Sequence, residues 1–335
     1  MKNLKKILAL ALVFAFSLTL FAGAAFTDDA DIGDEYKDDV SMLVELKILG
    51  GYPEGDFRPN GNITRAEFCK MVYVLMYGAD SDGSLFGAQT SKFNDVGDHW
   101  AKGYINYCAN QNIVGGYGDG TFKPDGNITV AEVSKMLLVL LGCDPAKEGF
   151  GGSNWIGNVV SKAMGLGVYD GWVGNSTELA TRQLVAKLMR NTIFAPVYRY
   201  NAFTGAGSQY NMDDEENKTL GETVMGLIHV TGQVVANEHF YIKTDKDGEL
   251  INDLLDNGNI STAREDHSYI LYYTEDNDAK LLEVDRALED TMLGCMVDVY
   301  FRAKGNENRY SQVEVIGNVL LNAKTKAYDV LSKDI

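Results

Sequence analysis

The residue types best suited to acid–base catalysis and metal binding are scattered along this sequence. His229 and His239 are too far apart to form a metal pair on one helix, and their strand-like surroundings favour ordinary surface or packing roles. The other two histidines are distant from both, at positions 99 and 267. No Gly-x-Ser-x-Gly motif, phosphate-binding glycine loop or zinc spacing occurs. We therefore expect no catalysis by residues 26–197.

Metal and disulfide signals are equally weak. Asp245, Asp247 and Glu249 resemble the start of a calcium loop, but Leu254 stands at its twelfth position, where a bidentate glutamate is needed. A hairpin turn is the better interpretation. The four cysteines form no CxxC pair and are too few for a disulfide framework: Cys69, Cys108, Cys143 and Cys295. We expect no metal and no cofactor.

The strongest pattern in the chain is a repeat. The stretches 50–67 and 115–132 read GGYPEGDFRPNGNITRAE and GGYGDGTFKPDGNITVAE, and a degraded third copy has its threonine at Thr181. Each copy reads as a helix, a glycine-rich loop and a second helix. A unit of this size cannot bury its own apolar face and needs its copies beside it. The three copies are expected to share one helical core around a pseudo-threefold axis, with similar grooves between neighbours.

The second helix of each copy has a clear start signal. Thr64 with Glu67, and Thr129 with Glu132, form the Thr-x-x-Glu capping box, in which each side chain binds the backbone of the other residue. The third copy has Leu184 in place of the glutamate, so its capping box is incomplete. Apolar stripes at helical spacing follow each start: Phe68, Met71, Val72 and Leu75; Val133, Met136, Leu137 and Leu140; Val185, Leu188 and Met189.

The first 25 residues predict secretion. A basic start precedes an uncharged apolar run, 7–21, and a small-residue exit at 22–25, which is typical of a cleaved signal peptide and shorter than a membrane span. Cleavage removes three lysines and changes the net charge from −17 to −20, with 27 basic against 47 acidic residues. Such a chain repels nucleic acid, so an anionic partner must be bound by local cations. After cleavage we expect no membrane span.

The pattern of the sequence changes after Pro196. Short β-type runs alternate with turn signals at 223–235, 239–243, 269–274, 296–302 and 311–316, which predicts a small barrel or sandwich. The sequence thus predicts a multidomain chain, an all-α three-repeat bundle followed by a small all-β domain. The expected boundaries are a signal peptide (1–25), copy 1 (26–79), a linker (80–92), copy 2 (93–144), copy 3 (150–197), a second linker (198–217), a β-rich domain (218–320) and a tail or further module (321–335).

The repeated motifs resemble the S-layer homology (SLH) family. The second copy carries Phe-Asn-Asp-Val at 93–96, His-Trp-Ala at 99–101, Gly-Tyr-Gly-Asp-Gly-Thr-Phe at 116–122 and Ile-Thr-x-Ala-Glu at 128–132. The first copy shares its last motif, and the third keeps Trp155, Tyr-Asp-Gly at 169–171 and Thr-Arg at 181–182. The resemblance implies a secreted protein of the cell wall or S-layer. It further implies non-covalent binding of secondary cell-wall polysaccharide, often through pyruvate ketals.

The resemblance assigns roles to individual residues. Arg65 and Arg182 are the implied partners of a ketal carboxylate, since a planar anion suits a bidentate guanidinium at a helix start. The alternative for each is a solvent-exposed arginine without a ligand. Further candidates for carbohydrate contact, each with a structural alternative, are Gly51 and Gly116 (loop geometry), Trp100 and Trp155 (core packing) and Glu67 (helix cap).

The second copy departs from the family at Val130, where the arginine is missing, so we expect two competent grooves. Val130→Arg is expected to strengthen binding if that groove is otherwise intact. Two functions stay open. One is a structural wall-anchored protein whose β domain is a spacer or contacts other S-layer subunits. The other is a wall-tethered enzyme or binding protein with its activity in the β domain or in a C-terminal continuation.

Overall fold

The computed structural model of the chain describes residues 26–201, 204–208, 218–243, 251, 262–274, 278–303, 310–316 and 320–321. The chain divides into two compact units, Met1–Met225 and Gly226–Ile335. The expected signal peptide and most of the expected tail, 322–335, lie outside the described residues. Among the residues described, no helix is both long enough and apolar enough to cross a membrane.

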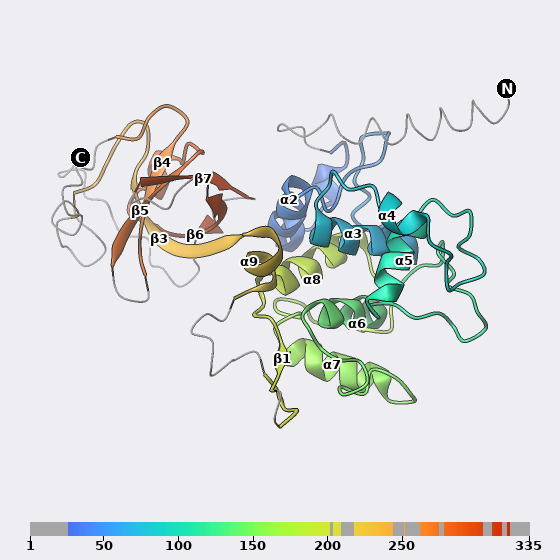
Figure 1. Ribbon diagram of the computed structural model, residues 1–335. Helices are drawn as coiled ribbons and strands as arrows, with labels where there is room; N and C mark the ends of the chain where they lie inside the picture. Colours follow the sequence, from blue (N-terminus) through green and yellow to red (C-terminus); the bar gives the residue numbers. More distant parts are fainter. Residues whose placement is uncertain are drawn as a thin grey trace. The chain divides into compact units, whose positions relative to one another are not determined.

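The described part of the first unit is mainly helical (Figure 1). Each copy contributes a first helix, a loop and a second helix, as the sequence predicts. The pairs are α2 (Lys37–Glu45) with α3 (Arg65–Tyr77), α5 (Lys102–Asn110) with α6 (Val130–Leu140), and α7 (Trp155–Gly165) with α8 (Arg182–Phe194). Shorter helices flank them: η1 (Asp29–Asp31), η2 (Asp34–Tyr36), α4 (Ser84–Gly87) and α9 (Leu220–Met225).

Both predicted capping boxes are present at the starts of α3 and α6. The backbone N–H of Thr64 donates to Glu67 Oε2 at 2.7 Å, and the N–H of Glu67 donates to the Thr64 hydroxyl at 3.2 Å. Thr181 makes no side-chain cap, as Leu184 predicts. Behind these starts, the predicted apolar stripes are buried, except that Leu140 is only half-buried.

The difference between Leu75 and Leu140 gives a stability prediction. Leu75→Ala removes a side chain that is 1% exposed, so we expect the free energy of unfolding to fall by about 2–5 kcal/mol. Leu140→Ala is the matched control and should cost clearly less, because solvent already reaches that side chain. Urea denaturation of both variants measures this. Equal losses would contradict the burial pattern.

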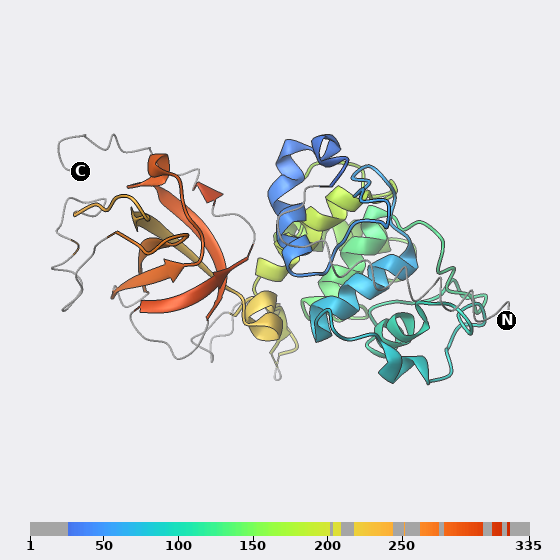
Figure 2. The same cartoon turned by 90° about the horizontal axis from the view of Figure 1, so that it is seen from above.

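The copies pack in a cyclic order. The second helix of each copy lies against the first helix of the next, with α3 on α5, α6 on α7 and α8 on α2. Figures 1 and 2 show α3, α6 and α8 gathered together in the first unit. Short backbone bridges follow the same order and return to the first copy: Thr64 with Asn127, Thr129 with Leu179, and Thr181 with Asn62.

Beside these bridges, carbonyl groups of the neighbouring copy accept hydrogen bonds from the first N–H groups of each second helix, which have no partner within the helix. Arg65 N donates to Gly126 O at 2.9 Å, and Ala66 N donates to Pro124 O at 2.9 Å. The first two N–H groups of α6 and α8 bind the next copy's loop in the same way, at 2.8–3.1 Å. These N–H groups are therefore not available as donors to an anion beside the arginine. A helix start needs acceptors for its orphan donors, and here the neighbouring copy supplies them.

The sequence predicts a linker at 198–217. The first residues of this segment are instead hydrogen-bonded to the helical part of the first unit. Strand β1 (Arg199–Tyr200) pairs with β2 (Gly207–Ser208). The Tyr200 hydroxyl donates to Glu148 Oε1 at 2.7 Å, and Lys162 Nζ lies 2.7 Å from Glu148 Oε2 and donates to the Tyr198 hydroxyl at 2.9 Å. One carboxylate thus joins α7 to the segment at 198–200.

Glu148 gives a pH prediction. Burial alone would raise its pKa, but hydrogen bonds from Lys162 and Tyr200 outweigh burial and hold the pKa below its ordinary value of 4.5. A carboxyl with a lowered pKa stabilises the fold above the unfolded value, and this stabilisation is lost as the pH falls through the folded value. We expect Glu148→Gln to flatten the loss of stability between about pH 5 and 3, measured by urea denaturation at each pH. Parallel curves for wild type and Glu148→Gln would contradict this.

The second unit contains strands β3 (Ile228–Ala236), β4 (Ser268–Tyr273), β5 (Ala279–Val284), β6 (Met296–Ala303), β7 (Tyr310–Val315) and β8 (Leu320–Leu321), with the short helix η3 (Asp290–Met292). Five strands pair in the order β3-β4-β5-β7-β6, and β6 pairs again with β3. All these pairs are antiparallel except β5 with β7. A core of buried apolar side chains, including Ile270 and Val299, lies on one face of the strands.

Three details differ from the predicted strands. The run at 223–235 begins as helix α9 and becomes strand only at Ile228. Strand β5 was not predicted. The run at 239–243 contributes one isolated bridge, between Tyr241 and Ala236, instead of a strand. The coarse prediction of a helical region followed by a small β region is confirmed, and the sheet of that region is mainly antiparallel.

Candidate carbohydrate site

Arg65 lies buried between copies 1 and 2. Its Nε donates to Phe122 O at 2.9 Å, and its Nη2 donates to Gly115 O at 3.0 Å. Its Nη1 donates to Glu132 Oε1 at 3.1 Å. The residue is 7% exposed, so the alternative of an arginine standing free in solvent is excluded. It reaches from the start of one helix onto the loop and helix cap of the next copy.

Arg182 repeats the two carbonyl contacts of Arg65, between copies 3 and 1. Its Nε donates to Phe57 O at 2.7 Å and its Nη2 to Gly50 O at 2.6 Å. It is 5% exposed, and burial lowers its pKa, while Tyr52 and Glu67 nearby favour the charged form. The two predicted arginines therefore occupy equivalent junctions. We call them the Arg65 junction (copies 1 and 2) and the Arg182 junction (copies 3 and 1).

A tyrosine ring accompanies each arginine. The guanidinium carbon of Arg65 lies 5.0 Å from the centre of the Tyr117 ring, and that of Arg182 lies 4.8 Å from the Tyr52 ring. Tyr117 is 48% exposed, so this ring borders solvent beside a buried charge. These tyrosines were not among the contact residues predicted from the sequence. Their identical offset from the two threonine caps was the signal that could have found them.

A lysine adds charge to the Arg65 junction. Burial lowers the pKa of Lys135, the negative charge of Glu132 raises it, and repulsion from Arg65 lowers it further. Lys135 Nζ also lies 5.6 Å from the centre of the Trp155 ring. Among the described contacts Trp155 lies beside Lys135 and not beside Arg65, so its role in binding stays a prediction.

Glu67 and Glu132 use their two oxygens differently. Oε2 of each closes the capping box, as predicted. Oε1 of Glu132 pairs with Arg65, and Oε1 of Glu67 accepts from the Tyr52 hydroxyl at 3.4 Å. Each glutamate is therefore a cap that also orients the groups beside the arginine. The structure places Glu67 at the Arg182 junction.

Gly51 and Gly116 are explained by close packing within their own copies. A Cβ at Gly116 would meet Thr121 O at 2.5 Å and the Phe93 ring at 2.8 Å. At Gly51 it would meet the Phe26 ring at 2.8 Å. Both are tighter than any real Cβ contact, so loop geometry alone requires glycine. Direct contact of these glycines with a sugar stays a prediction.

Trp100 is not brought to either arginine by any described contact. Its ring lies 5.5 Å from that of His99 and 6.2 Å from that of Tyr104, and the residue is 43% exposed. It therefore pins the start of α5 while keeping one side in solvent. Its role in binding stays a prediction.

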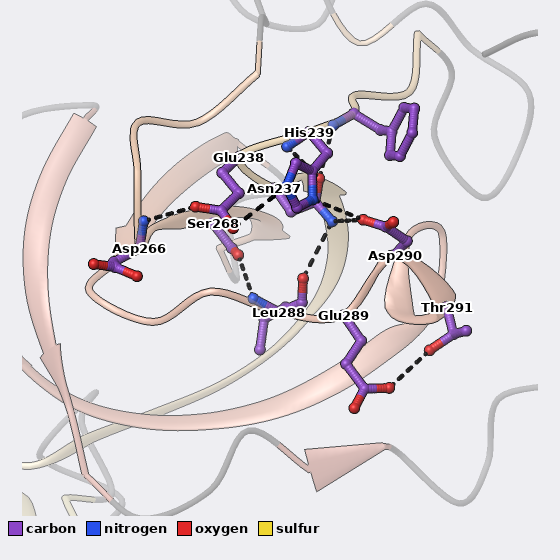
Figure 3. A network of polar contacts seen from close by, with 10 residues as sticks. Asn237, Glu238, His239, Asp266, Ser268, Leu288, Glu289, Asp290 and Thr291 are labelled. Atoms are coloured by element: carbon purple, nitrogen blue, oxygen red, sulfur yellow. Dashed lines mark hydrogen bonds and ion pairs between the residues drawn. The ribbon is translucent and has the colours of Figure 1, made fainter.

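A separate polar network in the second unit surrounds Asn237 (Figure 3). The Asn237 amide donates to Leu288 O at 3.1 Å and to Asp290 Oδ1 at 2.7 Å, and its carbonyl accepts from the N–H groups of His239 and Phe240. His239 Nδ1 lies 3.3 Å from Asp290 Oδ1. Asn237 is fully buried and every contact holds a turn in place, so we assign the network to structure. Within the described residues, no cluster of three or more His, Cys, Asp or Glu side chains could hold a metal ion.

Comparison with known proteins identifies the repeats. Residues 25–69 and 92–133 match the S-layer homology domain, so copies 1 and 2 carry this domain. The Cellulosome-anchoring protein of Acetivibrio thermocellus is 48% identical over 96 residues, covering 28% of this chain and 21% of that protein. The Surface layer protein of Brevibacillus choshinensis is 26% identical over 214 residues, covering 64% of this chain and 18% of that protein.

A protein named as an enzyme is also among those similar to this chain. The Amylopullulanase of Thermoanaerobacterium thermosulfurigenes is 33% identical over 178 residues, covering 48% of this chain and 9% of that protein. The chain thus spans only about a fifth or less of the length of these relatives. Together, the domain matches and the surface-layer and anchoring relatives identify a secreted, cell-wall-associated protein.

Proposed function

We propose that this chain anchors a secreted protein non-covalently to the bacterial cell wall by binding an acidic secondary wall polysaccharide. The binding sites are the Arg65 and Arg182 junctions. The observation that carries the proposal is a buried, fixed arginine beside a tyrosine ring at two equivalent positions of SLH-type repeats. A strongly acidic protein can hold an acidic polymer only at such local cations.

The guanidinium of Arg65 suits a carboxylate ligand. A guanidinium has five N–H donors, and three of those of Arg65 are donated to described protein atoms. The remaining two, one on each terminal nitrogen, are available for a planar anion such as a pyruvate ketal. Because the protein contacts fix the guanidinium, little side-chain entropy is lost when a ligand binds.

We further propose that the three copies form a single binding module with a pseudo-threefold axis. The cyclic backbone bridges and the cyclic helix packing support it. For the second unit, the closed order of strand pairing supports a small barrel. We propose that this barrel serves as a spacer or as a contact with other S-layer subunits.

A pulldown on cell-wall sacculi tests the anchoring proposal. We expect the full chain to sediment with native sacculi and to stay in solution with sacculi whose secondary polysaccharide has been chemically removed. A double variant, Arg65→Ala with Arg182→Ala, should stay in solution with both, provided that circular dichroism shows it to be folded. Equal sedimentation with both kinds of sacculi would exclude polysaccharide as the receptor.

The alternative is a wall-tethered enzyme with its activity in the second unit or in a continuation, and the similarity to an amylopullulanase keeps it open. We expect no hydrolysis of wall glycan or peptide by the described helical unit. Release of reducing sugars from sacculi by the full chain, abolished by one point substitution, would favour the enzyme.

A further inference from the structure

The junction between copies 2 and 3 lacks both members of the pair that characterises the Arg65 junction. The first helical residue of α6 is Val130, at the position of Arg65 and Arg182. The residue of copy 3 at the position of Glu132 is Leu184. Both are buried, with 1% and 8% exposure. The Arg65–Glu132 pair, which joins copies 1 and 2, thus corresponds to two apolar side chains at the junction between copies 2 and 3.

The tyrosine of this junction also has a different environment. Tyr169 stands at the position of Tyr117, but it is 7% exposed where Tyr117 is 48% exposed. Its hydroxyl is hydrogen-bonded to the Ser134 hydroxyl at 2.9 Å, and Ser134 in turn donates to Val130 O at 2.7 Å. Tyr169 therefore reaches across to the first turn of α6, where an arginine side chain begins at the other junctions. Its ring also packs at 4.8 Å on Trp172.

The lysine of the third copy already has an anionic partner. Lys187 stands at the position of Lys135, and its Nζ lies 2.9 Å from Asp39 Oδ2. The arginine, the glutamate and the lysine discussed for the Arg65 junction each have an altered counterpart here. The arginine and glutamate are apolar, and the lysine is paired with a buried carboxylate.

We propose that the junction between copies 2 and 3 is closed to the anionic polymer, with Tyr169 as its plug, and that the chain binds two carboxylate groups, not three. This rests on the proposed function of the other two junctions. Replacing a buried ion pair by apolar side chains on both sides is tolerated, whereas replacing one side alone leaves a buried charge without a partner. The closed junction therefore holds copies 2 and 3 together by packing. The groove at Val130 is thus not otherwise intact, so the gain in binding that the sequence suggested for Val130→Arg should not occur.

The number of bound carboxylates tests the proposal. We would titrate the full chain with a monosaccharide glycoside that bears a 4,6-pyruvate ketal and measure the heat of binding. We expect two equivalents for the wild type and one for Arg65→Ala. Three equivalents for the wild type would overturn the closed junction while leaving the proposed function intact. No binding by the wild type would overturn the proposed function and this inference with it.

Substitutions at the closed junction give an independent readout. Val130→Arg should add no equivalent and should lower the Tm of the helical unit by roughly 10 °C, since it buries an unpaired charge. Val130→Arg combined with Leu184→Glu should recover at least half of that loss. A third equivalent gained by Val130→Arg alone, or no recovery in the double variant, would contradict the proposal.

The role of Tyr169 can be tested separately, with Tyr117 as the matched control. Tyr169→Phe removes the hydroxyl bonded to Ser134, so it should lower the Tm while leaving the number of equivalents at two. Tyr117→Phe keeps the ring beside Arg65 and changes an exposed hydroxyl, so it should leave the Tm unchanged. If Tyr169→Phe lowers the number of equivalents, Tyr169 belongs to a binding site and the junction is open.

Discussion

Arg65→Ala is expected to weaken binding of the pyruvylated ligand at its junction by about 30-fold to several thousand-fold, which corresponds to about 2–5 kcal/mol. The reason is that a desolvated, charge-assisted hydrogen-bonding partner of the carboxylate is lost. Arg65→Lys should restore only part of the affinity, because an ammonium lacks the planar fork. Calorimetric titration with the ketal glycoside measures both variants.

Arg65 also holds copy 1 to copy 2 through three hydrogen bonds, so its loss lowers stability as well. Affinity must therefore be measured at a temperature at which circular dichroism shows the variant fully folded. Val130→Ala is the matched control at the same helical position and should leave affinity unchanged. If Arg65→Ala and Val130→Ala bind alike while folded, the arginine does not hold the anion.

Asp39→Ala is expected to lower the free energy of unfolding by about 3–5 kcal/mol. Asp39 on α2 lies 2.9 Å from Lys187 Nζ and 3.5 Å from Arg190 Nη1, both on α8, and its side chain is 4% exposed. Burial raises the pKa of Asp39 even beside two cations, so the ionised pair itself adds little net stability. The large cost arises because the substitution leaves the partly buried Lys187 ammonium without its carboxylate.

An exposed ion pair in the same region provides the comparison. Asp34 and Lys37 lie 2.6 Å apart with side chains that are largely in solvent, so Asp34→Ala should change stability little. Chemical denaturation of both variants measures the contrast. Similar losses for Asp34→Ala and Asp39→Ala would show that burial is not what makes the Asp39 cluster important.

The repeated helices could be predicted from local signals, because caps and apolar stripes depend on residues a few positions apart. The pairing of positions between copies could not. Leu184 leaves the capping box of its own copy incomplete, yet the cyclic packing assigns Leu184 to the junction of Val130. Each junction combines the first helical residue of one copy with the third of the next, and a linear comparison of the repeats does not show this.

Helix α9 shows a signal that was present and missed. Thr219 and Glu222 form the same reciprocal pair as the predicted caps, with Thr219 N donating to Glu222 Oε2 at 2.7 Å and Glu222 N to the Thr219 hydroxyl at 3.1 Å. The β-type residues that follow concealed it. The burial of the two arginines could not have been predicted, because it depends on carbonyl groups of a neighbouring copy more than fifty residues away for Arg65 and more than a hundred for Arg182.

The cyclic backbone bridges also constrain how this region can evolve. An open stack of repeats has two ends, so duplication or deletion can change the number of repeats without leaving a gap. Here the last copy bonds back to the first, and no end is left at which a further copy could be added. Loss of one copy would expose donors on one side and acceptors on the other. Change is therefore expected to proceed by altering individual junctions while the number of copies stays at three.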